Sequence, residues 1–130
     1  MRIFAQACPL FVPLVEEGWL KKQVTFDIAR EYLRPLRRAK IDTLILGCTH
    51  YPLLRNVLQK VMGPDVVLID SAKEVALEVK ETLAKMNQSH CRGAQKPRHQ
   101  FLTTDQPQQF EKIVNGFLGR NIKVKLGKLI

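Results

Sequence analysis

The sequence predicts an α/β fold in which helices cover a parallel β-sheet, and three observations support this prediction. Two short apolar runs, 44–46 and 66–69, are typical of strands buried on both faces of a parallel sheet. A segment with apolar residues at helical spacing follows each run. Turn or cap residues separate the strands from the helices. This alternation implies right-handed crossovers and a layered architecture.

An amphipathic helix precedes the first strand. Apolar residues recur at helical intervals from Val24 to Leu36, with arginines among the intervening positions. Pro35 lies inside this pattern, and a proline there removes one helical hydrogen bond. We therefore expect the helix to kink or end near Arg34.

The first strand is expected within 41–47, where Gly47 ends it. Pro52 suits the first turn of a helix, because its missing N–H would have no partner there. The helix over 52–62 is expected to bury Leu53, Leu54, Val57, Leu58, Val61 and Met62, and Gly63-Pro64 stops it.

After the second strand, the residues from Ser71 to Glu74 match a capping box that opens a third helix. The apolar positions of this helix predict a buried face made of Val75, Ala76, Val79, Leu83 and Met86. The polar stretch 87–99 is expected to be an exposed connection.

The C-terminal part predicts a brief strand at 101–102, a helix from Pro107 to Gly119 and an edge strand over 122–126 with its lysines outward. The helix is expected to turn inward Phe110, Ile113, Val114, Phe117 and Leu118.

Composition limits the class of protein. The 130 residues are 45% hydrophobic, which is enough for an ordinary core, and no apolar stretch is long enough for a membrane span. The start lacks the layout of a secretory signal, so we expect a cytoplasmic protein. The three cysteines, Cys8, Cys48 and Cys91, are widely spaced, which predicts free thiols and no metal. The net charge of +9 suits acidic partners such as nucleic acid, although solvated surface lysines are the commoner explanation.

Cys48 follows the end of the first strand, where open α/β sheets place their ligand crevice. It also precedes the predicted helix over 52–62, whose positive end would stabilise a thiolate. His50 is close enough in sequence to hold or deliver a proton. Two alternatives remain open from position alone: a cysteine that only fills space, and a histidine that only caps a helix.

Two motifs favour a functional role for Cys48 and His50. The stretch 47–54, Gly-Cys-Thr-His-Tyr-Pro-Leu-Leu, resembles the second catalytic-cysteine motif of glutamate racemases, and 7–16, Ala-Cys-Pro-Leu-Phe-Val-Pro-Leu-Val-Glu, resembles the segment that lies upstream of it in that family. The similarity continues through 67–71, 101–104 and 117–119, so it spans nearly the whole chain.

The resemblance implies a racemase that interconverts L- and D-glutamate for peptidoglycan without a cofactor. Such enzymes use two cysteines, one on each face of the α-carbon. By similarity Cys48 is one of this pair, His50 assists its proton transfers and helps bind substrate, Thr49 contributes to substrate binding, and Glu16 supplies a nearby carboxylate. Cys8 is expected to be structural, and Cys91 receives no role.

The first half of the family's sequence, with the other catalytic cysteine, has no counterpart here. By the resemblance, 1–70 forms the later part of the second α/β domain, and 71–130 returns to complete the first. We therefore expect an incomplete fold of marginal stability and no net racemisation by this chain alone. The expected partners are glutamate, the N-terminal half of the enzyme and, as a further option, a second copy in a homodimer.

Three other functions are compatible with the sequence. One is a relative that acts on aspartate. Another is a non-catalytic basic binding module that contacts DNA gyrase or nucleic acid, because some family members inhibit gyrase and the net charge of +9 suits acidic partners. The last is a remnant without function.

Overall fold

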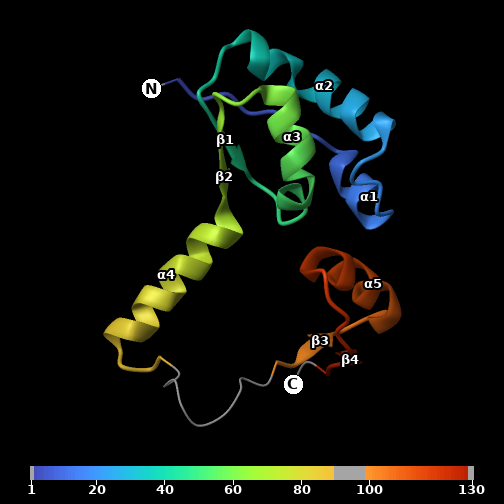
Figure 1. Ribbon diagram of the computed structural model, residues 1–130, viewed down its shortest axis with the longest axis vertical. Coiled ribbons are helices and arrows are strands. Elements are labelled where there is room, and N and C mark those ends of the chain that lie inside the picture. Colours follow the sequence, from blue (N-terminus) through green and yellow to red (C-terminus); the bar gives the residue numbers. More distant parts are fainter. Residues whose placement is uncertain (1, 90–98, 129–130) are drawn as a thin grey trace. The chain divides into compact units, whose positions relative to one another are not determined.

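The computed structural model describes residues 2–89 and 99–128. These residues form two compact units, 2–89 and 99–128 (Figure 1). Each unit contains a two-stranded sheet of its own, β1 with β2 in the first and β3 with β4 in the second. The two units are described separately below.

The first unit contains five helical elements and two strands. In chain order they are α1 (Phe11–Glu16), α2 (Gln23–Arg38), β1 (Thr43–Leu46), the 3-10 helix η1 (Tyr51–Leu54), α3 (Arg55–Met62), β2 (Val67–Asp70) and α4 (Ser71–Lys85). The strands β1 and β2 are parallel, with Thr43 opposite Val67 and Leu46 opposite Asp70. The predicted α/β class and the parallel pairing are both confirmed.

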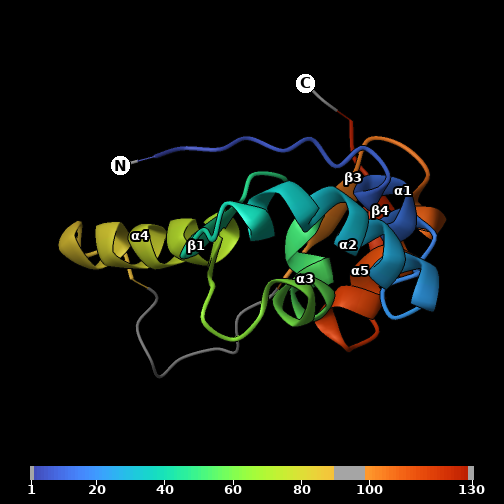
Figure 2. The same ribbon diagram turned by 90° about the horizontal axis from the view of Figure 1, so that it is seen from above.

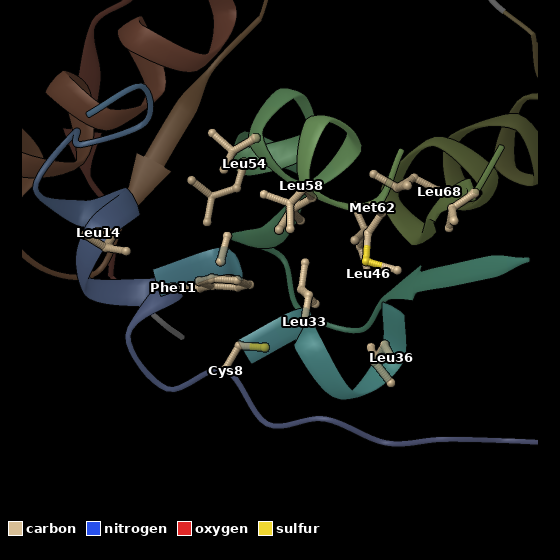
Figure 3. Close-up of a cluster of buried hydrophobic side chains, with 14 of the residues drawn as sticks. Cys8, Phe11, Leu14, Leu33, Leu36, Leu46, Leu54, Leu58, Met62 and Leu68 are labelled. Carbon is tan, nitrogen blue, oxygen red and sulfur yellow. The ribbon is translucent and has the colours of Figure 1, made fainter. Parts of the chain in front are cut away.

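The core of this unit lies between α1, α2, α3 and one face of the sheet. The helices α2 and α3 lie side by side (Figure 1 and Figure 2). Figure 3 shows the apolar side chains that converge there, among them Phe11, Leu33, Leu46, Leu54, Leu58 and Leu68. Burial of these side chains supplies the main stabilisation of the unit, at roughly 25 cal/mol per Å² of apolar surface.

The other face of the sheet is open, and in this respect the sequence prediction was wrong. Leu46 and Leu68 are buried, whereas Ile45 is 69% exposed and Val67 is 58% exposed. Successive side chains of a strand point to opposite faces. The helices of this unit therefore cover one face of the sheet. The second face is exposed to water, although both strands carry apolar residues on it as well.

Pro35 does not end α2, contrary to the expectation from sequence. The helix continues to Arg38, and the Ala39 N–H donates to the carbonyl of Pro35 at 3.0 Å. Leu36, in this last turn, is 5% exposed and belongs to the core. The free energy gained by burying Leu36 offsets the loss of the helical hydrogen bond that Pro35 cannot make.

The third predicted helix, α4, forms as expected but differs in its cap and its burial. The cap is Asp70, whose side chain accepts the Ala72 N–H at 2.9 Å, so Ser71 is the first helical residue rather than the cap. The face expected to be buried is exposed, with Val75 at 60% and Val79 at 50%. In Figure 1 and Figure 2, α4 extends away from α1, α2 and α3.

The second unit contains β3 (Phe101–Thr103), α5 (Pro107–Leu118) and β4 (Val124–Leu126). The strands are parallel, with Phe101 opposite Val124. The carboxylate of Glu111 on α5 accepts the Val124 N–H at 3.0 Å and fixes the helix to β4. Phe110 and Phe117, expected to point inward, are 40% and 58% exposed, because the sheet against which α5 packs within this unit has two short strands. The predicted connection over 87–99 falls mostly outside the described residues.

None of the helices in the described ranges is both long and apolar enough to cross a membrane.

Candidate functional site

The candidate site lies in the turn after β1. The strand ends at Leu46, Gly47 and Cys48 follow, and η1 begins at Tyr51. The turn is held by its own backbone, because the Tyr51 N–H donates to the Cys48 carbonyl at 3.2 Å and the Leu53 N–H donates to the His50 carbonyl at 3.1 Å. The prediction that Cys48 follows the carboxyl end of a parallel strand is confirmed.

The helix after Cys48 begins differently from the prediction. Its first turn is the 3-10 helix η1, and the α-helix proper starts at Arg55. The Tyr51 and Leu53 N–H groups at the start of this turn already have backbone partners, Pro52 has no N–H, and the aligned peptide dipoles of a 3-10 turn are few. The electrostatic support for a Cys48 thiolate therefore depends less on a helix and more on neighbouring side chains.

His50 joins Cys48 to Glu16. Its Nδ1 lies 3.9 Å from the Cys48 Sγ, and its Nε2 lies 3.4 Å from the Glu16 Oε1. The two ring nitrogens of one imidazole thus face a thiol on one side and a carboxylate on the other. With a proton on Nε2 toward the carboxylate, Nδ1 is free to accept the thiol proton. The arrangement can move a proton on and off sulfur.

Glu16 reaches this site because it is the last residue of α1. The segment α1 packs against η1, which places the end of a helix from early in the chain beside the turn after β1. The contact of Glu16 with His50 is partly open to water, since the two side chains are 48% and 31% exposed. Such an ion pair contributes little stability by itself.

Thr49 is exposed, and its hydroxyl lies 3.4 Å from the Nδ1 of His50. The structure therefore brings together all four residues that the sequence predicted for the site: Glu16, Cys48, Thr49 and His50.

Cys8 differs from Cys48 in its surroundings. It is 4% exposed, and burial raises the pKa of its thiol to about 11. A thiol of this kind stays protonated and unreactive at neutral pH. This agrees with the structural role expected for it. Cys91 lies outside the described residues.

A cavity of about 760 Å³ lies next to the site rather than at it. Its walls include the segment 2–6, β1, Cys8, Gly47 and Tyr51, but not Cys48, His50 or Glu16. Within residues 2–89 and 99–128, no cluster of three His, Cys, Asp or Glu side chains could hold a metal ion.

Sequence reasoning did not single out Tyr51, although it lies inside the motif after Cys48. Its hydroxyl donates to the carbonyl of Cys8 at 3.4 Å, and its ring packs edge-on against Phe11 with centroids 5.4 Å apart. No local signal in the sequence pairs these residues, because the hydrogen bond joins positions 43 residues apart.

The turn after β1 thus defines a class: an α/β protein with a thiol at the end of a parallel strand and a histidine that connects it to a carboxylate. Comparison with known proteins gives the family. The glutamate racemase of Syntrophus aciditrophicus strain SB is 50% identical over 121 residues, which is 93% of this chain and 44% of that protein. The glutamate racemase of Streptococcus gordonii is 45% identical over 125 residues, 96% of this chain and 47% of that protein.

Solved structures agree. The glutamate racemase isoform RacE1 of Bacillus anthracis superposes with a TM-score of 0.87 at 36% identity, over 99% of this chain and 48% of that one. The Thermus thermophilus glutamate racemase, solved with β-chloro-D-alanine, superposes with a TM-score of 0.82 at 37% identity, over 96% of this chain and 47% of that one. No family model matches the sequence.

By sequence and structure the chain belongs with the glutamate racemases, as a homologue of the C-terminal half of these proteins. It spans about half the length of the curated relatives that it matches. The expected family and the expected match to a C-terminal half are confirmed.

Proposed function

We propose that this chain supplies one of the two proton-transferring thiols of a glutamate racemase, and that this thiol is Cys48. The observation that carries the proposal is the position of His50 between the Cys48 Sγ, at 3.9 Å, and the Glu16 Oε1, at 3.4 Å, in a homologue of glutamate racemases. The substrate proposed is glutamate. A glutamate racemase from Francisella tularensis, with a TM-score of 0.82 and 28% identity, was solved in complex with D-glutamate.

The proposed step is a proton abstraction. The Cys48 thiolate takes the α-hydrogen of glutamate as a proton, so a sulfur–hydrogen bond forms while the carbon–hydrogen bond breaks. The electron pair stays on the α-carbon and is delocalised into the adjacent carboxylate. A second thiol then donates a proton from the opposite face, which inverts the centre. That second thiol belongs to the part of the family sequence that this chain does not span.

The neighbouring residues have separate roles in this proposal. His50 accepts the proton of the Cys48 thiol through Nδ1 and returns it, which resets the base between turnovers. Glu16 orients the imidazole through Nε2, which leaves Nδ1 toward the thiol. Thr49 is exposed beside them and contributes its hydroxyl to substrate binding.

The proposed partner is a polypeptide equivalent to the N-terminal half of a glutamate racemase. The site as described is open to water, whereas removal of a weakly acidic α-hydrogen requires a desolvated base. Large apolar side chains also remain exposed on several elements: Ile45, Val67, Val75, Val79, Leu83, Met86, Phe117 and Leu126. A partner half would cover surface of this kind. In that assembly we propose that 1–70 completes one α/β domain and 71–130 completes the other. A homodimer and contact with gyrase or nucleic acid stay predictions from the sequence.

Racemisation in a two-chain assembly tests the proposal. The N-terminal half of the Syntrophus aciditrophicus enzyme is produced together with this chain, and conversion of D- to L-glutamate is followed by circular dichroism. We expect activity from the pair, none from this chain alone, and a loss of at least a hundredfold for Cys48→Ser. Cys91→Ser, which changes a cysteine without a proposed role, is the matched control and should leave the rate unchanged.

Two results would contradict the proposal. One is racemisation by the 130-residue chain alone that disappears in Cys48→Ser, because one thiol would then suffice. The other is an active pair in which Cys48→Ser retains full activity.

A further inference from the structure

Residues 50 and 51 connect the turn after β1 to opposite ends of α1. His50 meets Glu16, the last residue of the helix, with 3.4 Å between Nε2 and Oε1. The Tyr51 hydroxyl donates to the carbonyl of Cys8, which also accepts the Phe11 N–H at 3.1 Å where the helix begins. Because α1 has six residues, two contacts at its ends leave it little freedom to turn relative to Cys48.

The two contacts differ in their surroundings. The contact between Glu16 and His50 is partly exposed and is weak by itself. Tyr51 is half-buried, and its ring rests edge-on against Phe11, which is 1% exposed. Tyr32 also packs edge-on against Phe11, with ring centroids 5.5 Å apart. Aromatic edge contacts of this kind add to the stabilisation from burial.

Tyr51 also acts on Cys48 through the backbone, because its N–H donates to the Cys48 carbonyl at 3.2 Å. One residue thus fixes both the turn that carries the thiol and the start of the helix that carries the carboxylate. Burial, together with the nearby Cys8 and Cys48, raises the pKa of the Tyr51 phenol, so it remains a hydrogen-bond donor at neutral pH.

We propose that Tyr51 is a positioning residue, which holds Glu16 against His50 and thereby sets the reactivity of the Cys48 thiol. This inference rests on the proposed function for the identity of the reacting group. It goes beyond that proposal because it assigns the geometry of the site to a residue that touches neither the substrate nor the proton in transit.

The test is the rate at which iodoacetamide alkylates Cys48 in the full 130-residue chain, followed by peptide mass spectrometry from pH 6 to pH 10. Glu16→Gln should slow alkylation several-fold at neutral pH and move the midpoint of the pH profile upward, since the His50 ring loses the carboxylate that holds it toward the Cys48 Sγ. Tyr51→Phe removes one hydroxyl and should produce a similar slowing and a similar upward movement.

The decisive result is the combination of the two changes. If Tyr51 positions Glu16, the double variant should be no slower than Tyr51→Phe alone, because the carboxylate is already misplaced. Effects that multiply, or an unchanged profile for Tyr51→Phe, would overturn the inference. Tyr32→Phe, which removes a hydroxyl from the other tyrosine that packs against Phe11, is the matched control and should leave the profile unchanged.

A second measurement leaves position 51 intact. In Glu16→Gln the Phe11 amide should remain protected from hydrogen exchange, because Tyr51 still holds the start of α1. Loss of that protection would show that the helix depends on the ion pair instead, and would contradict the inference. Neither measurement uses glutamate, so the role of Tyr51 can be judged even if the racemase proposal fails.

Discussion

The helices α3 and α4 have similar apolar spacing in the sequence, yet their environments differ. In α3, Val57 and Leu58 are 2% and 1% exposed, whereas in α4 Val75 and Val79 are 60% and 50% exposed. The first helix packs against α2, and the second extends away from the core (Figure 1). Periodicity therefore predicts that a helix forms and which face is apolar, but burial of that face depends on a partner.

The largest expected effect is on stability, when one apolar side chain in each of these two helices is truncated to alanine. Leu58→Ala should cost about 2–5 kcal/mol, because it leaves a cavity in the core, and should remove the cooperative unfolding of the first unit. Val79→Ala should change stability by no more than about 0.5 kcal/mol. Urea unfolding followed by fluorescence reports on this unit, because Trp19 is the single tryptophan of the chain. Equal costs at the two positions would show that α4 is packed in solution.

A smaller effect concerns pH and belongs to the core of the first unit. Burial raises the pKa of Cys8 from an ordinary 9.0 to about 11, so the neutral thiol stabilises the folded state. This contribution is complete below pH 9 and is lost as the pH rises toward 11. The loss should amount to about 2 kcal/mol.

The check on this effect is the free energy of unfolding at pH 8 and at pH 10.5, with Trp19 as the probe. Cys8→Ala should remove most of the difference, because it removes the titrating group. A decline of the same size in the variant would assign the pH dependence to another group.

The second unit should respond to acid rather than to alkali. The hydrogen bond from the Val124 N–H, with Lys123 as a lesser contributor, lowers the pKa of Glu111 from its ordinary 4.5. The stabilisation is therefore present above pH 4.5 and is lost as the pH falls through the lowered pKa. We expect the protection of the Val124 amide, measured relative to its intrinsic exchange rate at each pH, to fall in acid, and to show no such acid dependence in Glu111→Gln. An amide equally protected at pH 2 would contradict it.

The sequence predicted those parts of the structure that depend on neighbours along the chain. The run 44–46 and the residues after it were enough to place Cys48 and His50 beyond a strand end. The cap of α4 was misplaced by one residue, since Asp70 and Ser71 both suit that position and only the backbone decides between them.

Contacts between distant segments could not be predicted from local patterns. Glu16 entered the site only through the family resemblance, because its contact with His50 depends on how α1 packs against η1. The hydrogen bond of Tyr51 to the Cys8 carbonyl likewise depends on the packing of segments that are distant in the sequence. Pro35 was predicted to kink or end the helix near Arg34, and the helix does not end there, since the burial of Leu36 was not part of the local argument.

The most direct test of the central claim is the exchange of the α-hydrogen of glutamate with solvent deuterium. This chain and the N-terminal half of the Syntrophus aciditrophicus enzyme are incubated with D-glutamate in D₂O, and deuterium at the α-carbon is measured by mass spectrometry. The account predicts that deuterated L-glutamate accumulates with Cys48 present and is not formed in Cys48→Ser. Deuterated L-glutamate formed at an unchanged rate in Cys48→Ser would contradict it.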